Sequence, residues 1–175
     1  AEVTPQHLIF TDEALRTFET RYKMNPPIRS DIHRDACVEG LKDGTIDAVV
    51  TDHAPHEWEE KDQEFNLAPS GFVGLETSVG AMLTHLYHTG IIDLMSLVNV
   101  MSTAQAKILN LDAGVIAPGK DADLTFLDLD KEWTVDSSKF YSKGKSTPFD
   151  EMIFKGKAAA TIVNGKFVMK NGEVL

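Results

Sequence analysis

The sequence predicts an α/β fold that ends in a small β unit, and three observations lead to this prediction. A short apolar strand at 46–51 follows a predicted helix, as in a parallel sheet buried on both faces. Segments with helical periodicity then fill residues 75–110, which is the strand-then-helices order of α/β proteins. Near the end, the Asn164-Gly165 pair separates two apolar runs and predicts a hairpin, because both residues tolerate positive φ.

The beginning of the chain is predicted to contain a strand and one short helix. Residues 1–10 have the pattern of a strand followed by a loop, with Pro5 ending the regular structure. Segment 11–22 carries Leu15 and Phe18 among polar residues, which indicates a short amphipathic helix.

A second helix is predicted after a rigid loop. Pro26 and Pro27 hold this loop extended and exclude a helix from it. Ser30 is then placed to cap a helix that ends in the region of Gly40 and Gly44. One face of this helix is predicted to be apolar and to consist of Ile32, Ala36, Cys37 and Leu41.

Three helices are predicted after the 46–51 strand, at 75–88, 93–101 and 103–110. The first has apolar residues at helical spacing, namely Leu75, Val79, Met82, Leu83 and Leu86.

The pattern changes near residue 111. Strand-like alternation appears in 113–129, the hairpin occupies 158–174, and 136–157 is predicted to be a less regular connection. We therefore expect two parts, with residues 1–111 in the α/β part and residues 112–175 in a small β unit.

Composition excludes several classes of function. A formal net charge of −10 argues against nucleic acid or an anionic membrane as the main partner. No apolar run reaches the roughly 20 residues of a membrane helix, and the start does not have the pattern of a signal peptide. Cys37 is the only cysteine, so no internal disulfide forms, which fits a reducing cytoplasm.

The most informative segment is Thr51-Asp52-His53-Ala54-Pro55-His56, at the end of the predicted strand. The carboxyl ends of parallel strands face the active site in α/β folds. Asp52 is therefore a candidate metal ligand or general base, and His53 and His56 could orient it, bind an anion or ligate. The alternative is that Asp52 only caps the following turn and that both histidines lie on the surface. A polar, mobile loop is expected at 57–67.

Other polar residues are weaker candidates. His7 could line the same pocket, and Asn25 could present an amide to a ligand, although an Asn before a proline is often only a turn residue. The remaining histidines lie on predicted helices and are interpreted as surface or packing residues: His33, His85 and His88.

Several motifs together resemble bacterial-type dihydroorotases, a family of the amidohydrolase superfamily. The resemblance covers nearly the whole chain, and the Thr-Asp-His-Ala-Pro-His and Met-Asn-Pro-Pro runs are its most specific parts. The motifs occur in the family's order, as Glu2-Val3-Thr4-Pro5-Gln6-His7-Leu8, Lys23-Met24-Asn25-Pro26-Pro27-Ile28-Arg29, Asp43-Gly44-Thr45-Ile46-Asp47, Thr51 to His56, Gly74-Leu75-Glu76-Thr77 and Gly114 to Leu124.

The resemblance implies a fold and a set of site residues. Residues 1–111 would be the last strands and helices of a (β/α)₈ TIM-type barrel, and 112–175 would belong to the small accessory domain. Asp52 resembles the family's metal-ligating aspartate, which also transfers protons, and His56 resembles the histidine that meets the substrate carboxylate. Asn25 and the Ser70-Gly71 backbone would contact the substrate. The family usually has an aromatic residue at the position of Ser70.

The resemblance also implies zinc chemistry, with one or two Zn²⁺ ions. Zinc lowers the pKa of bound water to about 7 and polarises the amide carbonyl. The family's other metal ligands include a His-x-His pair, which this chain lacks. A catalytic zinc takes about three protein ligands, so we expect this chain alone to bind zinc poorly. Glu2-Val3-Thr4 has the pattern of a strand with no earlier partner, so the expected source of the remaining ligands is an N-terminal part.

Three interpretations follow from the resemblance. The first is a fragment of a dihydroorotase, which hydrolyses dihydroorotate reversibly to N-carbamoyl-aspartate in pyrimidine biosynthesis. The second is a related cyclic-amide hydrolase, such as a dihydropyrimidinase or an allantoinase. The third is a non-catalytic, dihydroorotase-like subunit. By the same resemblance, the expected partners are aspartate carbamoyltransferase and further copies of the same chain.

Overall fold

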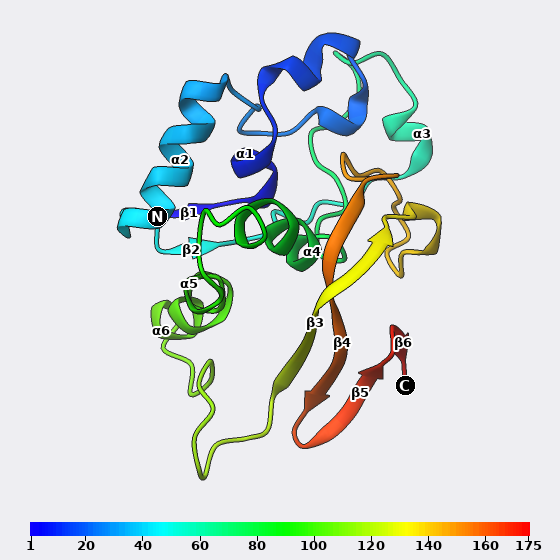
Figure 1. Cartoon of the computed structure of the whole chain (residues 1–175). Helices are drawn as coiled ribbons and strands as arrows, with labels where there is room; N and C mark the ends of the chain where they lie inside the picture. Colours follow the sequence, from blue (N-terminus) through cyan, green and yellow to red (C-terminus); the bar gives the residue numbers. More distant parts are fainter. The chain divides into compact units, whose positions relative to one another are not determined.

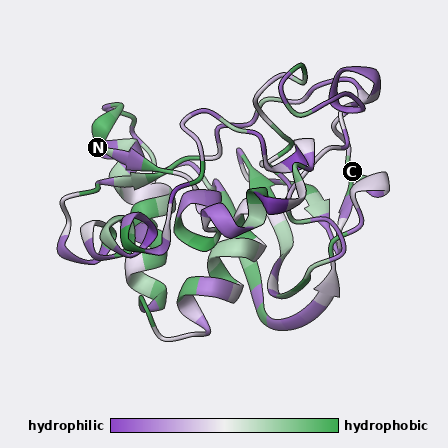
Figure 2. Cartoon of the chain, turned by 90° about the horizontal axis from the view of Figure 1, so that it is seen from above, coloured by the Kyte–Doolittle hydropathy of each residue, from purple (hydrophilic) through white to green (hydrophobic).

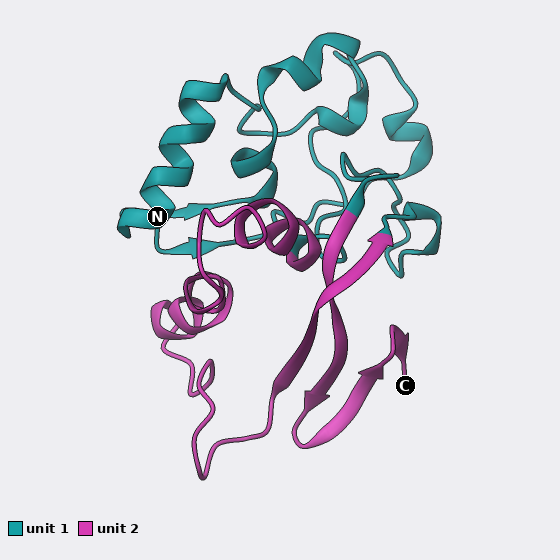
Figure 3. Ribbon diagram, viewed as in Figure 1, with its two compact units in different colours: residues 1–78, 134–153 teal, residues 79–133, 154–175 magenta.

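The computed structural model describes residues 1–175, and its fold is mixed α/β, as the sequence predicts. The chain divides into two compact units (Figure 3). Unit 1 contains residues 1–78 and 134–153, and unit 2 contains residues 79–133 and 154–175. No helix has both the length and the apolar character that crossing a bilayer requires.

Unit 1 begins with strand β1 (Glu2–Val3), which pairs in parallel with β2 (Ala48–Val49) (Figure 1). All of these residues except Glu2 are buried, so the apolar character of the predicted 46–51 strand is explained, although the strand is shorter. Helix α1 (Pro5–Ile9) follows β1 directly. The prediction that Pro5 ends regular structure is wrong, because proline at the first helical position loses no hydrogen bond.

The amphipathic helix predicted at 11–22 is also wrong. Two short 3₁₀ helices, η1 (Asp12–Thr17) and η2 (Thr20–Tyr22), occupy this segment, and neither contains a buried residue. Phe18 interrupts them with a left-handed φ of 54° and is 70% exposed. None of the apolar residues of this segment is buried, so no face of a helix is held against a core: Ala14, Leu15, Phe18 and Tyr22.

Helix α2 (Asp31–Asp43) confirms the predicted ends, since Ser30 is its N-cap residue and Gly44 ends it with a φ of 82°. The Ser30 side chain makes no capping hydrogen bond. The predicted apolar face is only partly right, because Leu41 is buried whereas Ile32 is 75% exposed.

Segment 57–67 is not simply a loop. It contains helix α3 (Trp58–Lys61). A capping box formed by Glu57 and Glu60 stabilises the N-terminus of this helix. The last residue of this helix, Lys61, is only 3% exposed.

The predicted helix at 75–88 begins three residues later, as α4 (Ser78–Met82), and continues as the π-helical turn η3 (Leu83–Tyr87). Leu75 lies before this helix and is 58% exposed, whereas Met82, Leu83 and Leu86 are fully buried as predicted.

The helices predicted at 93–101 and 103–110 form one continuous helical segment. Helix α5 (Leu94–Val98) passes through the π-helical turn η4 (Asn99–Thr103) into α6 (Ala104–Ile108). Hydrophobic and hydrophilic residues alternate around the helices of the chain (Figure 2), as expected where one face is buried.

A four-stranded sheet with the order β3-β4-β5-β6 completes the chain. Its strands are β3 (Leu124–Thr134), β4 (Ile153–Val163), β5 (Lys166–Lys170) and β6 (Glu173–Val174). The predicted hairpin is confirmed, with φ values of 49° at Asn164 and 73° at Gly165 between β4 and β5.

Two predictions about this region need correction. No strand covers 113–123, so the strand predicted at 113–129 starts too early. The connection predicted at 136–157 is shorter, because β4 already begins at Ile153, and it includes a 3₁₀ helix, η5 (Ser137–Lys139). The division of the chain between 111 and 112 stays a prediction.

Candidate functional site

Asp52 follows strand β2 by three residues and has an exposed side chain. Its φ of 49° lies in the left-handed region, which aspartate and asparagine tolerate better than most residues. The backbone therefore turns sharply at the residue that the sequence singles out.

His53 joins the segment after β2 to the segment at 72–75. It forms a parallel bridge with Phe72, and its Nδ1 accepts hydrogen bonds from the backbone N–H groups of Gly74 (3.2 Å) and Leu75 (3.3 Å). A ring nitrogen that accepts carries no proton, so these two contacts require an unprotonated Nδ1. His53 thus has a structural role that the sequence does not reveal.

His56 has a partner at each ring nitrogen. Its Nε2 lies 2.9 Å from the carbonyl oxygen of Ser70, and its Nδ1 lies 3.2 Å from Oε2 of Glu60. Both partners can only accept, so the ring donates to both when it is doubly protonated. A substrate carboxylate that binds His56 must therefore displace one of these two acceptors.

Ser70 and Gly71 lie against this histidine. Ser70 is exposed, whereas Gly71 is buried, and the Gly71 N–H donates to the carbonyl of Lys23 at 3.0 Å. The Gly71 carbonyl accepts from Nζ of Lys61 at 2.9 Å. The Ser70-Gly71 backbone, which the sequence predicts to contact a substrate, is thus held by hydrogen bonds to Lys23, His56 and Lys61.

Asn25 lies two residues after Lys23 and is exposed. The carbonyl of the next residue, Pro26, accepts from Nε2 of His7 at 2.9 Å, and Nδ1 of His7 lies 2.6 Å from the Thr4 hydroxyl. Both nitrogens of His7 are engaged, so His7 positions the loop that carries Asn25.

The structure brings some of the predicted site residues together. His56, Ser70 and Gly71 are in contact, and the hydrogen bond from Gly71 to Lys23 links them to the loop of Asn25. Asp52 is connected to this group only through the backbone of 53–56. All of these residues belong to unit 1.

Three further residues contact the predicted site residues or the adjacent loop, and no motif or periodicity in the sequence indicates them: Lys23, Glu60 and Lys61. The one available hint is the spacing of Glu57 and Glu60, which is that of a capping box with glutamate as the cap.

The donor set does not by itself fit a metal ion. No group of three or more His, Cys, Asp or Glu side chains in the chain is arranged to hold one. Asp52 supplies one carboxylate, whereas catalytic zinc takes about three protein ligands.

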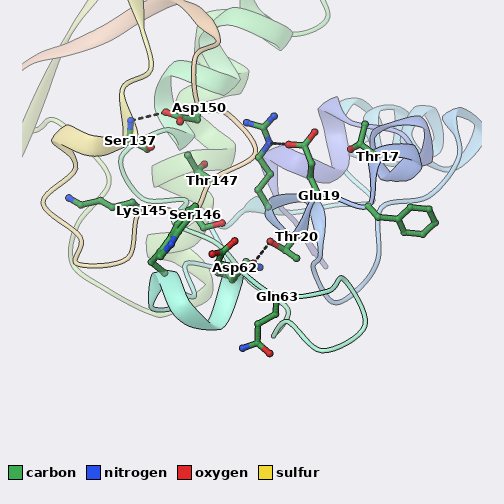
Figure 4. Close-up of a pocket in the computed structure, with 14 residues that line it drawn as sticks. Thr17, Glu19, Thr20, Asp62, Gln63, Ser137, Lys145, Ser146, Thr147 and Asp150 are labelled. Atoms are coloured by element: carbon green, nitrogen blue, oxygen red, sulfur yellow. Dashed lines mark hydrogen bonds and ion pairs between the residues drawn. The ribbon is translucent and has the colours of Figure 1, made fainter.

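A cavity of about 490 Å³ also lies in unit 1 (Figure 4), but none of the predicted site residues lines it. An Arg21–Glu19 ion pair (2.7 Å) and a hydrogen bond from the Ser137 N–H to Asp150 (2.8 Å) occupy its walls. Its charged side chains have both signs and do not form an anion or cation site: Glu19, Arg21, Lys61, Asp62, Lys145 and Asp150.

Glu60 caps helix α3 and also contacts His56, so we expect Glu60→Ala to affect both. Loss of the capping interaction should lower the free energy of unfolding by about 1 kcal/mol. The neighbouring Glu59→Ala is the matched control, because Glu59 is exposed and only its backbone carbonyl makes a hydrogen bond, to Gln63. Chemical denaturation of both variants measures the difference, and equal losses would contradict the capping role.

Comparison with known proteins places this geometry in a family. The model described as the amidohydrolase family matches residues 4–168. The chain is 46% identical over 175 residues to a dihydroorotase of Bacillus licheniformis and 45% identical to one of Bacillus subtilis, and it spans 41% of each. A dihydroorotase of Citrifermentans bemidjiense is 49% identical over 167 residues, which is 39% of that protein.

Solved structures show the same fold. The L-hydantoinase (dihydropyrimidinase) from Arthrobacter aurescens has a TM-score of 0.94 and 37% sequence identity, over 99% of this chain and 40% of that one. A dihydropyrimidinase from Brevibacillus agri has a TM-score of 0.91 and 26% identity over the same shares. The chain thus spans about two fifths of the proteins that it matches.

Proposed function

The chain belongs to the amidohydrolase family, and we propose that the protein is a dihydroorotase, which opens dihydroorotate reversibly to N-carbamoyl-aspartate. The observation that carries this proposal is an identity of 45% to 49% with dihydroorotases over at least 95% of the chain. The identity with the L-hydantoinase is lower, at 37%, which favours dihydroorotate over hydantoin as the substrate.

Residues 1–111 are proposed to be the end of a (β/α)₈ barrel, and residues 112–175 the small accessory part. The short parallel pair of β1 and β2, buried and with a carboxylate just beyond β2, supports this arrangement. The carboxyl end of β2 would then face the active site.

Asp52 is proposed to be the proton-transfer residue. Ring opening adds water across the C–N bond of the cyclic amide, with the oxygen bonding to the carbonyl carbon. Asp52 would take the water proton on a carboxylate oxygen and return it to the leaving ring nitrogen. Its exposed side chain, at a sharp turn after a buried strand, supports this role.

The substrate is proposed to contact Asn25, His56 and the Ser70-Gly71 backbone. The pyrimidine-type ring of the substrate would lie beside Ser70, which is exposed. The substrate carboxylate would take the place of the Ser70 carbonyl or the Glu60 carboxylate at the His56 ring, and either exchange keeps the number of hydrogen bonds made by the ring constant.

The cofactor is proposed to be Zn²⁺, one or two ions, with Asp52 as one ligand. The other ligands would come from outside this chain, because its own residues do not complete a site. Metal analysis of the natural protein tests this, and tight stoichiometric zinc in the 175-residue chain alone would contradict it.

An assay with three substrates tests the proposed function. We expect the natural protein that carries this chain to open dihydroorotate faster than dihydrouracil or hydantoin, and a chelator to abolish the activity. Faster turnover of hydantoin or dihydrouracil would instead indicate a hydantoinase or dihydropyrimidinase. No turnover of any of the three would leave an allantoinase or a non-catalytic subunit, and an assay with allantoin separates these two.

The proposed partners are aspartate carbamoyltransferase and further copies of the chain, in the cytoplasm. Co-purification from cells at native expression tests both. A clean monomer without the transferase would contradict them.

A further inference from the structure

Lys61 is a buried cation that the proposed reaction does not use. It is 3% exposed, and Nζ donates hydrogen bonds to two backbone carbonyls, those of Pro69 (3.0 Å) and Gly71 (2.9 Å). An ammonium is costly to bury, and these two hydrogen bonds offset part of that cost.

The contacts fix a single peptide segment. The carbonyls of Pro69 and Gly71 accept from Lys61, and the carbonyl between them, that of Ser70, faces Nε2 of His56. Three consecutive carbonyls are therefore turned toward cationic or N–H donors. Within this segment Ser70 is exposed, whereas Gly71 is buried.

A second lysine holds the preceding residues in the same way. Nζ of Lys23 donates to the carbonyls of Phe65 (2.7 Å) and Asn66 (3.1 Å), and the Lys23 carbonyl accepts from the Gly71 N–H at 3.0 Å. Lys61 is itself held at its backbone, since its carbonyl accepts from the Thr20 hydroxyl at 2.6 Å.

We propose that Lys61 is a positioning residue, whose side chain holds the Pro69 and Gly71 carbonyls so that the Ser70-Gly71 peptide is presented to a cyclic-amide substrate. This inference rests on the proposed function, in which Ser70 and Gly71 contact the substrate. Lys61 does not touch the reacting atoms, and its effect is on substrate affinity.

The protonation of Lys61 gives this role a pH dependence. Burial, with a smaller contribution from repulsion by Lys23, lowers the pKa of Lys61 to about 8. Above that pH, a neutral amine has one donor fewer and no charge, so its hold on the carbonyls weakens.

The expected loosening is local. Because the pKa is lower in the folded protein than in the unfolded chain, the unfolded chain binds more protons between about 8 and 10.5. The contribution of Lys61 to global stability therefore rises with pH in this window, while its hold on 69–71 weakens. Lys23 repels the Lys61 ammonium from a different loop. The other charged groups around Lys61 belong to its own helix or line the same cavity: Glu19, Arg21, Glu59, Glu60, Asp62, Lys145 and Asp150.

Amide hydrogen exchange in the natural protein tests the role without relying on activity. In Lys61→Met, which keeps the side-chain volume, we expect exchange of 65–71 to become about tenfold faster, as loss of charge-assisted hydrogen bonds implies. Exchange in α2 should not change. In the unaltered protein, protection of 65–71, corrected for the intrinsic rate, should fall between pH 7 and 9.5.

Kinetics separate positioning from a merely structural role. We expect Lys61→Met to raise KM for dihydroorotate about tenfold with kcat within about twofold, a change in binding rather than in chemistry. Lys61→Arg should restore the affinity for dihydroorotate. It should also abolish the fall in exchange protection of 65–71 between pH 7 and 9.5, because arginine stays charged. Lys131→Met, at an exposed position of unit 2, is the matched control and should change nothing.

The outcomes distinguish the two proposals. Unchanged exchange in Lys61→Met, or protection that stays constant with pH in the unaltered protein, would overturn the role of Lys61 whatever the activity. A natural protein that does not open dihydroorotate would refute the proposed function, and the exchange data would still decide whether Lys61 holds the segment. If Lys61→Met does not fold, the pH series of the unaltered protein decides.

Discussion

Asp52→Asn is expected to lower kcat for dihydroorotate ring opening by about 10²- to 10⁴-fold, the usual contribution of a general base. The amide of asparagine has the shape of the carboxylate but does not take up a proton at neutral pH. Asparagine also tolerates the left-handed φ of 49° at this position, so the turn after β2 should persist. The loss would then report on chemistry rather than on folding.

Two controls make this result interpretable. The exposed Asp121 lies in unit 2, and Asp121→Asn removes the same charge without touching the site, so its kcat should stay unchanged. Thermal unfolding of Asp52→Asn should show the same midpoint as the parent protein. Normal turnover by Asp52→Asn would refute its role as the base and as a required metal ligand.

Local chemistry explains which features could be predicted from the sequence. The hairpin at Asn164-Gly165 and the end of α2 at Gly44 depend on the φ values that these residues adopt easily, and both are confirmed. The sequence also singles out Asp52, because a carboxylate at the end of the predicted 46–51 strand is placed to face an active site, and this role stays a prediction.

Tertiary contacts explain most of what could not be predicted. The burial of Lys61 depends on carbonyls eight and ten residues further along the chain, and no periodicity in the sequence records this contact. The structural role of His53 likewise depends on N–H groups at Gly74 and Leu75. The prediction of a helix at 11–22 was wrong because an apolar periodicity in the sequence does not guarantee a surface against which the helix can pack.

The close packing of Gly71 leads to the second large effect. A Cβ at this position would lie 2.7 Å from Cβ of Ala54, 3.0 Å from the Ala54 carbonyl oxygen and 3.1 Å from Nε2 of His56. The φ of 124° is also unfavourable for any residue with a side chain. We expect Gly71→Ala to lower the free energy of unfolding by about 3 kcal/mol, as the sum of backbone strain and overpacking.

Gly44→Ala separates these two causes. Gly44 has a φ of 82°, but a Cβ there would meet no atom within 4 Å, so only the backbone cost of about 1 kcal/mol applies. Chemical denaturation of both variants gives the difference, which measures the close approach of Gly71 to Ala54 and His56. Because the clash displaces the His56 ring or the Ser70-Gly71 peptide, Gly71→Ala should also raise KM for dihydroorotate, whereas Gly44→Ala should not. Equal destabilisation of the two variants, with KM unchanged in both, would show that the packing of Gly71 against His56 has no bearing on substrate binding.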